Sequence, residues 1–374
     1  MSVSSNLRAV LEQPPDWPCF PDLGIGIIGG GGIVQHAHLP AYRKAGYQVH
    51  GIAARRREQV EQLGETFGIS QRETDYRRLL NDPRIAIIDV AVPGADRVQI
   101  ARDAAEAGKH LLLQKPLADT FDEAREIVKI AAQCGVLLAV NHNARWAPAY
   151  RAAGELIDSG VIGEVFDVVH EMRDSQDSQE FFRNGWYSKQ KRYQIIQYAV
   201  HHLDLMQFWM KKSPRWVWAQ TARKPEQFAD GEMQSTIVLS YENEATALII
   251  DRNADWPDSP GFHRFRIEGT KGTIEGEARS NSLTVRCAGS TGEVWQPRLK
   301  GQWFPDAFAD AMGNLMKAIK GVEHLAVPGE ANLEVLRIVE AAYISADLGH
   351  RVSLDTFWPA EERSLSGAAA ESTY

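Results

Sequence analysis

The sequence has few cysteines, no long apolar run and no excess of positive charge, and each shortage argues against a class of protein. Its three cysteines, Cys19, Cys134 and Cys287, form no CxxC pair, so neither a zinc knuckle nor a redox dithiol is indicated. No apolar stretch reaches the length of a membrane span. A net charge of -8 argues against a nucleic-acid partner. We therefore expect a cytoplasmic protein, since few cysteines suit a reducing compartment, with no nucleic-acid and no membrane partner.

The length and composition suit a globular protein of two domains with sizeable cores. The chain has 374 residues, of which 44% are hydrophobic and 24% charged. Residues 1–21 contain four prolines and no long apolar run, so we expect an extended arm, which could pack on a partner subunit, rather than a signal peptide. Residues 359–374 are small and polar and are expected to form a flexible tail.

Residues 22–143 alternate between apolar runs and helical patterns. The runs are nearly continuous, which suits parallel strands covered by helices on both faces. Strands that alternate with helices predict a doubly wound α/β domain of the dinucleotide-binding Rossmann type. The predicted strands are residues 23–28, 47–53, 85–92, 110–113 and 136–140, and the predicted helices are 33–45, 57–67, 98–107 and 119–134.

The pattern changes in residues 144–358, where strand-like runs follow one another without helices between them. Such a series predicts an open, largely antiparallel sheet and thus an α+β domain for substrate binding or oligomerisation. Residues 173–192 are polar and have no clear period. The predicted strands are 165–172, 216–221, 233–241, 245–252, 263–268, 273–275 and 282–286, and the predicted helices are 148–159, 194–210, 306–319 and 331–348.

A glycine-rich turn, residues 29–32, stands directly after the first predicted strand and before the first predicted helix. This is the context that the dinucleotide-binding fingerprint requires. Gly29 would make the tight turn, Gly31 would let the backbone approach a pyrophosphate, and the helix N-terminus would face the phosphate charge. Val34 occupies the third position, where the fingerprint has Gly or Ala, which implies a slightly wider helix–strand contact. A plain strand–helix turn is the alternative interpretation.

The second predicted strand ends in Ala53-Ala54-Arg55-Arg56-Arg57, without the acid that binds the ribose 2′-hydroxyl of NAD. The missing acid removes repulsion toward a 2′-phosphate, and an arginine can pair with that phosphate bidentately. We therefore favour NADP over NAD. The arginines could instead be the solvated start of a helix, although arginine there opposes the helix dipole.

Several motifs accompany the glycine turn: Ile28-Gly29-Gly30-Gly31-Gly32-Ile33, Val92-Pro93, Glu106-Ala107-Gly108-Lys109-His110, Lys115-Pro116-Leu117-Ala118, Asn143-x-Arg145-Trp146-x-Pro148 and Val339-Glu340-Ala341-Ala342-Tyr343. Together they resemble the Gfo/Idh/MocA family, which includes glucose–fructose oxidoreductase and inositol dehydrogenase. The resemblance covers nearly the whole chain after residue 22. It implies a Rossmann domain followed by an α+β domain whose open sheet commonly forms a subunit interface, and hence a homodimer or homotetramer. It also implies a sugar, sugar derivative or cyclitol as substrate.

The resemblance assigns the central role to Lys115, in Gln114-Lys115-Pro116, where the family has Glu-Lys-Pro. In the family this lysine approaches the substrate hydroxyl and the nicotinamide ribose. Its place at a predicted strand end agrees with the ligand crevice of open α/β sheets, although a surface lysine in a loop is the alternative. The expected cofactor-binding residues are Gly29, Gly31, Gly32, Ile33, Ala54, Arg55, Arg56, Pro93, Gln114, Lys115 and Asn143. The expected substrate-binding residues are Lys115, Arg145, Trp146, Gln197 and His201.

The family also has Asp and His four residues apart on a helix, and the matching positions here are Gln197 and His201. That spacing puts both side chains on one helix face, and His202 points elsewhere. We therefore predict His201 as a second catalytic residue, with a hydrogen-bonded core histidine as the alternative. Gln197 cannot take a proton, and Lys191-Arg192-Tyr193 replaces the family's glycine-rich lead-in. Both changes put the usual proton relay and the usual substrate in doubt.

We predict no metal site, because His36-x-His38 and His201-His202 lack a third ligand at a convincing spacing. The predicted function is hydride transfer between NAD(P) and a secondary alcohol, with Lys115 and His201 handling the hydroxyl proton. The alternatives are an NAD-dependent glycosidase-like enzyme and a non-catalytic regulator that senses dinucleotide. Gln197 keeps both alternatives open, while Lys115 and His201 favour chemistry over sensing.

Overall fold

The computed structural model describes residues 3–288 and 294–357, and it divides the chain into two compact units. The parallel-sheet unit consists of residues 13–148 and 300–333. The mixed-sheet unit consists of the described parts of residues 1–12, 149–299 and 334–374. The predicted flexible tail, residues 359–374, lies outside the described residues.

The parallel-sheet unit contains a six-stranded sheet in the order β3-β2-β1-β4-β5-β6, and all neighbouring strands in it are parallel. This confirms the predicted doubly wound domain. The short strand β3 was not predicted, because its residues are polar and form no apolar run. The strands are β1 (Gly24–Ile28), β2 (Val49–Ala53), β3 (Gln71–Glu73), β4 (Ile85–Val90), β5 (His110–Gln114) and β6 (Leu138–Asn141).

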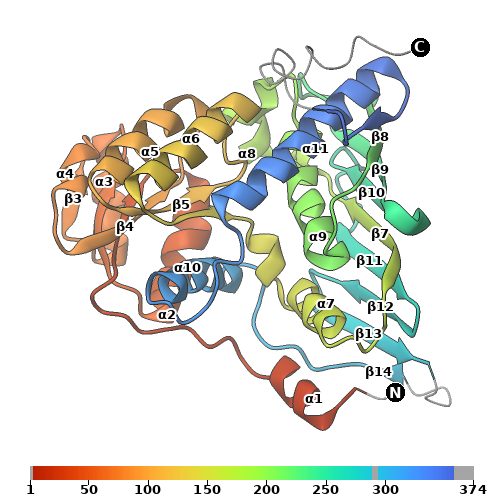
Figure 1. The fold of residues 1–374 in the computed structure, drawn as a ribbon. Coiled ribbons are helices and arrows are strands. Elements are labelled where there is room, and N and C mark those ends of the chain that lie inside the picture. Colours follow the sequence, from red (N-terminus) through yellow and green to blue (C-terminus); the bar gives the residue numbers. More distant parts are fainter. Residues whose placement is uncertain (1–2, 289–293, 358–374) are drawn as a thin grey trace, which may run out of the picture. The chain divides into compact units, whose positions relative to one another are not determined.

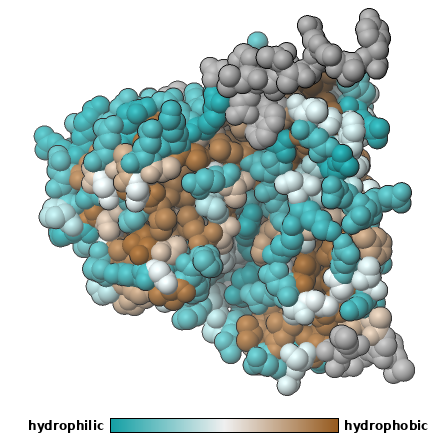
Figure 2. All heavy atoms as spheres, viewed as in Figure 1, coloured by the Kyte–Doolittle hydropathy of each residue, from teal (hydrophilic) through white to brown (hydrophobic). Residues whose placement is uncertain are grey.

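Helices cover both faces of this sheet: α2 and α10 lie on one side and α5 and α6 on the other (Figure 1). A capping box between Thr120 and Glu123 begins α6, and Gly135 ends it with a left-handed φ of 68°. The outer surface over α5 and α6 is mainly hydrophilic, and hydrophobic residues gather below it (Figure 2). The helical segments are η1 (Val34–His38), α2 (Leu39–Ala45), α3 (Arg57–Phe67), α4 (Arg77–Leu80), η2 (Gly94–Asp96), α5 (Arg97–Glu106), α6 (Phe121–Cys134), η3 (Asn143–Trp146) and α10 (Asp306–Ile319).

Helix α10 belongs to this unit although it lies near the end of the chain. Its Phe308, Met312 and Leu315 are fully buried in the same hydrophobic core as β1 and α2. The Tyr47 hydroxyl donates to the Ala309 carbonyl at 3.1 Å, which joins α10 to the segment before β2. The predicted helix over residues 306–319 is confirmed, while its place beside the parallel sheet is a finding of the structure.

The N-terminal residues are not extended throughout, so this part of the prediction is wrong. Ser5–Leu11 form helix α1, because the Ser4 hydroxyl caps it by accepting from the Leu7 N–H at 3.2 Å. The proline-rich residues that follow are anchored to their own chain. The Trp17 indole donates to the Asp310 carboxylate of α10 at 3.0 Å.

The mixed-sheet unit contains a nine-stranded sheet in the order β14-β13-β12-β11-β7-β10-β9-β8-β15. Only the pair β7–β10 is parallel among its described strands, so the predicted open, largely antiparallel sheet is confirmed. The strands are β7 (Val165–Arg173), β8 (Trp216–Ala222), β9 (Gln234–Ser240), β10 (Thr246–Arg252), β11 (Phe262–Gly269), β12 (Gly272–Glu277), β13 (Ser282–Cys287), β14 (Val294–Trp295) and β15 (Val352–Ser353).

Helices α7, α9 and α11 cover one face of this sheet (Figure 1). Strands β9 and β10 alternate between buried and partly buried residues, as expected when one face packs on helices. The Ser345 hydroxyl of α11 accepts from the Ala219 N–H of β8 at 2.9 Å. The helical segments are α7 (Pro148–Asp158), η4 (Gln176–Ser178), α8 (Glu180–Arg183), η5 (Trp186–Lys189), η6 (Gln194–Ala199), η7 (Glu242–Glu244), α9 (Val200–Met210) and α11 (Gly329–Leu348).

Within the described ranges, none of the helices combines the length and the apolar character that crossing a membrane requires.

Candidate active site

Most of the predicted site residues in the parallel-sheet unit follow the carboxyl ends of its strands. Gly29 follows β1, Pro93 follows β4 and Lys115 follows β5, while residues 54–56 follow β2 and Asn143 follows β6. The carboxyl ends of parallel strands meet at one edge of a sheet, so the fold brings these residues to the same edge. Strands β1 and β4 are neighbours from which the chain winds in opposite directions, and open α/β sheets bind ligands at such a point.

The turn after β1 has the backbone geometry that a phosphate-binding turn needs. Gly29 has a left-handed φ of 128°, and a Cβ there would collide with the Ala91 carbonyl oxygen of the segment after β4. Gly31 is exposed, and a Cβ built on it would meet no atom within 4 Å. The Gly31 carbonyl accepts from the Val34 and Gln35 N–H groups at 3.0 and 3.1 Å, which starts the helix at once. An exposed glycine turn followed by a helix N-terminus fits a dinucleotide pyrophosphate.

Val34 is fully buried and begins a π-helical segment, η1, rather than an α-helical turn. A π-helix has more residues per turn than an α-helix, and such segments are frequent at functional sites. Ile33 directly precedes η1 and is 37% exposed, so its side chain lies on the open side of the glycine turn.

The three arginines after β2 differ in their partners. Arg57 is paired with Glu61 at 3.3 Å and donates to the Arg72 carbonyl, as expected of a solvated helix start. Arg55 is exposed and pairs with Asp96 at 3.1 Å. The Arg56 side chain is exposed and makes no hydrogen bond or ion pair with any residue in the ranges 3–288 and 294–357, while its backbone carbonyl accepts from the Val60 N–H. Arg56 is therefore the guanidinium most available to an anion.

Lys115 lies in surroundings that favour its neutral form. Burial, together with the nearby Arg97 guanidinium, lowers the pKa of Lys115 to about 7. The Arg97 side chain is itself buried and donates to the Val92 carbonyl at 2.9 Å and to the Pro116 carbonyl. Arg97 thus holds the segment after β4 to the segment after β5 while keeping a positive charge near the lysine. No sequence pattern indicated Arg97 as a site residue, because its hydrogen-bond partners are the carbonyls of separate loops.

A buried chain of polar groups lies behind Lys115. The Gln114 side-chain oxygen accepts from the Lys115 backbone N–H at 2.8 Å, and its amide nitrogen lies 3.0 Å from His38 Nε2. The other nitrogen of His38, Nδ1, lies 2.6 Å from Asp89 Oδ2, which also accepts from the Tyr42 hydroxyl at 2.7 Å. The amide can only donate to Nε2, so Nδ1 carries the ring proton.

The sequence analysis did not identify Asp89 and His38 as site residues, although an acid inside an apolar strand pattern could have indicated Asp89. Asp89 is the single charged residue inside the apolar run of β4 and is fully buried. A buried acid needs a donor, and η1 brings His38 to it. The resulting chain fixes the orientation of Gln114 and thereby the backbone at Lys115.

The other predicted residues of this unit contact the returning C-terminal segment. Asn143 is buried and accepts from the Trp303 indole at 2.8 Å. Arg145 donates to the Ala326 carbonyl at 2.9 Å, and Trp146 is partly exposed. Residues 300–333 therefore hold η3 in place at the end of β6.

Gln197 and His201 lie in the mixed-sheet unit. Gln197 is buried within the π-helical segment η6, and the partly exposed His201 lies in the first turn of α9. The expectation that both share a face used α-helical spacing, which a π-helical segment does not follow. His202 is buried and hydrogen-bonds Asp251 through Nδ1 at 2.9 Å, so it is a residue of the core.

The segment that leads into η6 is held by residues that the sequence did not single out. Glu232 Oε1 accepts from the Tyr193 and Gln194 N–H groups, both at 3.1 Å, and from the Tyr343 hydroxyl at 2.8 Å. This carboxylate caps the start of the helix, where negative charge is favourable. Arg192 pairs with Glu340 at 3.1 Å and lies over the Tyr343 ring. Glu340 and Tyr343 belong to the C-terminal motif 339–343, so that motif supports the replaced lead-in.

Comparison with known proteins identifies two matching family models. The model described as "Oxidoreductase family, NAD-binding Rossmann fold" matches residues 23–142, and the GFO/IDH/MocA C-terminal domain matches residues 150–275. A D-apiose dehydrogenase from Paraburkholderia graminis is 27% identical over 92% of this chain and 94% of its own. A D-xylose 1-dehydrogenase (NADP(+)) from Haloferax volcanii is 25% identical over 88% of this chain and 99% of its own.

Solved structures show the same fold. A levoglucosan dehydrogenase in complex with NADH and L-sorbose has a TM-score of 0.80 at 21% identity, covering 90% of this chain and 99% of its own. An oxidoreductase from Agrobacterium radiobacter in complex with NAD+, L-tartaric acid and magnesium has a TM-score of 0.78 at 23% identity, covering 89% and 99%.

Proposed function

Since the chain belongs to the Gfo/Idh/MocA family of NAD(P)-dependent oxidoreductases, we propose that it oxidises or reduces a secondary alcohol of a sugar, sugar derivative or cyclitol. Relatives that match most of both chains are named as dehydrogenases of D-apiose and D-xylose. The observation that carries the proposal is Lys115, whose pKa is lowered to about 7, at the sheet edge that also holds the glycine turn. The bound nicotinamide cofactor supplies the hydride acceptor or donor.

Lys115 is the group that we assign to the hydroxyl proton. In the oxidation direction its neutral amine accepts the proton that leaves the alcohol, and in the reduction direction its ammonium returns it. A pKa of about 7 makes both forms available near neutral pH. Gln114 keeps the lysine backbone in place through its hydrogen bond. His201 is the second proton-handling group in this proposal, since the amide of Gln197 can hydrogen-bond a substrate hydroxyl but cannot take its proton.

The proposed cofactor contacts follow the strand ends. Gly29, Gly31, Gly32 and Ile33 would hold the pyrophosphate, and Ala54, Arg55 and Arg56 the adenosine ribose. Pro93, Gln114, Lys115 and Asn143 would border the nicotinamide half.

NADP is the favoured cofactor because no acid follows β2 directly and because the Arg56 guanidinium has no partner within the described residues. Arg56→Ala should raise the KM for NADP roughly tenfold to a hundredfold, as expected for losing a hydrogen-bonded charge pair. The KM for NAD should stay unchanged. Arg57→Ala is the matched control, because Arg57 is already paired with Glu61. A preference for NAD in the parent protein, with no effect of Arg56→Ala, would reject this cofactor assignment.

The substrate class is tested by absorbance at the reduced-nicotinamide band, with NAD and NADP separately, across a panel of sugars and cyclitols. Reduction of the cofactor by at least one polyol or sugar is the expected result. Release of a leaving group from glycosides without net cofactor reduction would instead identify a glycosidase. Tight dinucleotide binding with no turnover across the panel would identify a sensing protein.

We also propose that the protein is a homo-oligomer that pairs through its open sheet. Phe166 of β7 is 47% exposed on an otherwise well-packed central strand, and burying such a side chain against a second copy would be favourable. Light scattering on the purified protein tests this, and a monomer at micromolar concentration would contradict it.

A further inference from the structure

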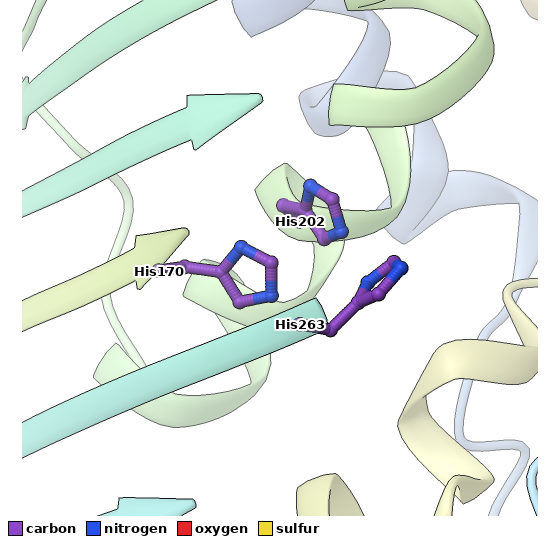
Figure 3. A group of neighbouring side chains, drawn as sticks. All are labelled: His170, His202 and His263. Carbon is purple, nitrogen blue, oxygen red and sulfur yellow. The ribbon is translucent and has the colours of Figure 1, made fainter. Parts of the chain in front are cut away.

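We propose that His170, His202 and His263 form a binding site for a divalent transition-metal ion of the zinc class inside the mixed-sheet unit. The three side chains come from β7, α9 and β11, and their rings point toward one another (Figure 3). One nitrogen from each ring lies within 4.8 Å of the other two. Imidazole nitrogen is a preferred ligand of zinc, and three histidines make a recurring protein site for it.

The protonation state of the cluster suits a metal ligand. His170 and His263 are buried, and burial lowers the pKa of each well below the ordinary value of histidine. The neighbouring His202 lowers the pKa of both further, and Arg279 contributes at His263. Burial thus favours the neutral form of both rings. A neutral imidazole offers the lone pair that a metal ion requires.

A hydrogen bond outside the cluster selects the nitrogen that His202 presents. Asp251 Oδ2 accepts from His202 Nδ1 at 2.9 Å, so the lone pair of His202 is on Nε2. The Tyr150 hydroxyl lies 2.7 Å from His170 Nε2. Nδ1 of His170 is buried and has no hydrogen-bond partner within the part of the chain that the structure describes. A carboxylate behind a ligating ring, as Asp251 lies behind His202, is a common outer arrangement of histidine metal sites.

Charge and packing favour a cation over an empty cluster. The Asp251 side chain is fully buried, and its hydrogen-bond partner within the described chain is His202. A buried carboxylate is costly unless hydrogen bonds or a positive charge compensate it. The His170 and His202 ring centroids are 3.9 Å apart, a separation that would be unfavourable if both rings were protonated. A divalent ion bound by the three rings would bring a positive charge close to this buried carboxylate.

Such a site would fix the beginning of α9 to the central strands of the sheet. His202 is the third residue of α9, and β7 and β11 are hydrogen-bonded neighbours. The residue before it is His201, so a metal bound here would restrict the backbone from which His201 projects. The role is structural, and it does not depend on the proposed substrate.

The first experiment measures metal in the untagged protein, produced with zinc in the medium and passed through desalting. Elemental analysis should find about one zinc per chain. Unfolding, chelation and refolding with cobalt(II) should give the visible absorption bands of a cobalt ion with nitrogen ligands. Less than about a tenth of an equivalent after both treatments would overturn the proposal, because structural zinc sites are filled close to stoichiometrically.

The second experiment asks whether these histidines hold the ion. His170→Gln and His263→Gln should each lose the bound zinc and the cobalt bands, while circular dichroism and dinucleotide binding remain. His350→Gln, which changes an exposed histidine of the same unit, should keep both signals. If the cluster variants keep a full equivalent of metal, the ion is bound elsewhere and the assignment is wrong. If a variant does not fold, the metal content of the parent protein still decides the question.

Discussion

Each unit of the molecule contains a fully buried histidine–aspartate pair next to a residue assigned to proton transfer. In the parallel-sheet unit, His38 and Asp89 lie 2.6 Å apart and reach Lys115 through Gln114. In the mixed-sheet unit, His202 and Asp251 lie 2.9 Å apart, and His202 directly follows His201 in the chain. The two pairs have the same chemistry but different surroundings.

The difference lies in what the second ring nitrogen meets. His38 Nε2 meets an amide that can donate to it, and Asp89 also receives the Tyr42 hydroxyl, so this chain is closed by hydrogen bonds. His202 instead faces two further histidine rings, and one nitrogen of each of the three rings lies within 4.8 Å of the other two. The hydrogen-bonded groups around His38 can therefore orient Gln114 without a ligand. The three-histidine cluster around His202 would be stabilised more by binding a metal ion.

The largest expected effect is on kcat, and it tests which of the two units supplies the main proton-transfer group. Lys115→Met should lower kcat roughly 10²- to 10⁴-fold, because it removes a general acid–base group. His201→Asn should cause a smaller loss, since Lys115 remains. Steady-state rates with the best substrate of the panel measure both changes, and fluorescence titration checks that the cofactor still binds.

Lys129→Met is a suitable control for Lys115→Met, because Lys129 lies on α6 of the same unit and carries none of the proposed chemistry. A rate for Lys115→Met within twofold of the parent would refute the assignment of the lysine. A larger loss for His201→Asn than for Lys115→Met would move the main role to the other unit.

The next prediction separates the two aspartates. Asp89→Asn should lower the free energy of unfolding by about 1–3 kcal/mol, because the buried His38 and Tyr42 donors lose a charged acceptor. Adding a chelator should not change that loss. Asp251→Asn should lower metal affinity roughly 10- to 100-fold, as other outer carboxylates do. Its stability cost should therefore be larger in metal-loaded protein than in chelated protein.

Urea unfolding followed by circular dichroism, with and without chelator, measures both variants. Equal costs for Asp251→Asn in the two conditions would remove the distinction between the pairs. A chelator-dependent cost at Asp89 would show that the metal, if present, is not at the histidine cluster.

Apolar runs and glycines in the sequence were enough to predict most strands of the parallel sheet and the ends of its helices. The runs that became β1, β4 and β5 are apolar because both faces of the parallel sheet are covered, and glycines mark the helix ends. Strand β3 has no apolar run that would predict it, because Gln71–Glu73 is an edge strand of half-buried polar residues. Neither π-helical segment, η1 or η6, has a distinctive composition, since the shift from four- to five-residue hydrogen bonds is set by packing.

The candidate site shows the same limit at the level of single residues. The glycine turn and Lys115 could be found because they occupy fixed places after strands. Glu232 caps the start of η6 from 39 positions along the chain, and the histidine cluster joins residues 170, 202 and 263. No spacing rule connects such residues, because sheet order and not sequence distance makes them neighbours. The prediction of no metal site considered only histidines that are close together in sequence.

The smallest effect expected is a shift in pH dependence caused by Arg97. Its positive charge and burial together hold the pKa of Lys115 near 7, and burial is the larger cause. Arg97→Gln removes the charge and leaves most of the burial, so the pKa of Lys115 should rise but stay below that of a free lysine. Oxidation needs the neutral amine, so its rate increases as pH rises through the pKa. The rising limb of kcat/KM against pH should therefore move to higher pH in the variant.

Two further variants show whether charge is the cause. Arg97→Lys keeps a positive charge beside Lys115 and should leave the limb where it is, even if the altered contacts with the Val92 and Pro116 carbonyls lower the rate. Arg102→Gln removes a guanidinium from the same helix. Because Arg102 is partly exposed and paired with Glu126, this change should leave the pH dependence of kcat/KM unchanged. In the reduction direction the ammonium is required, and the falling limb should move upward by the same amount. Opposite movements of the two limbs would mean that another group titrates, because a single pKa must shift both in one direction.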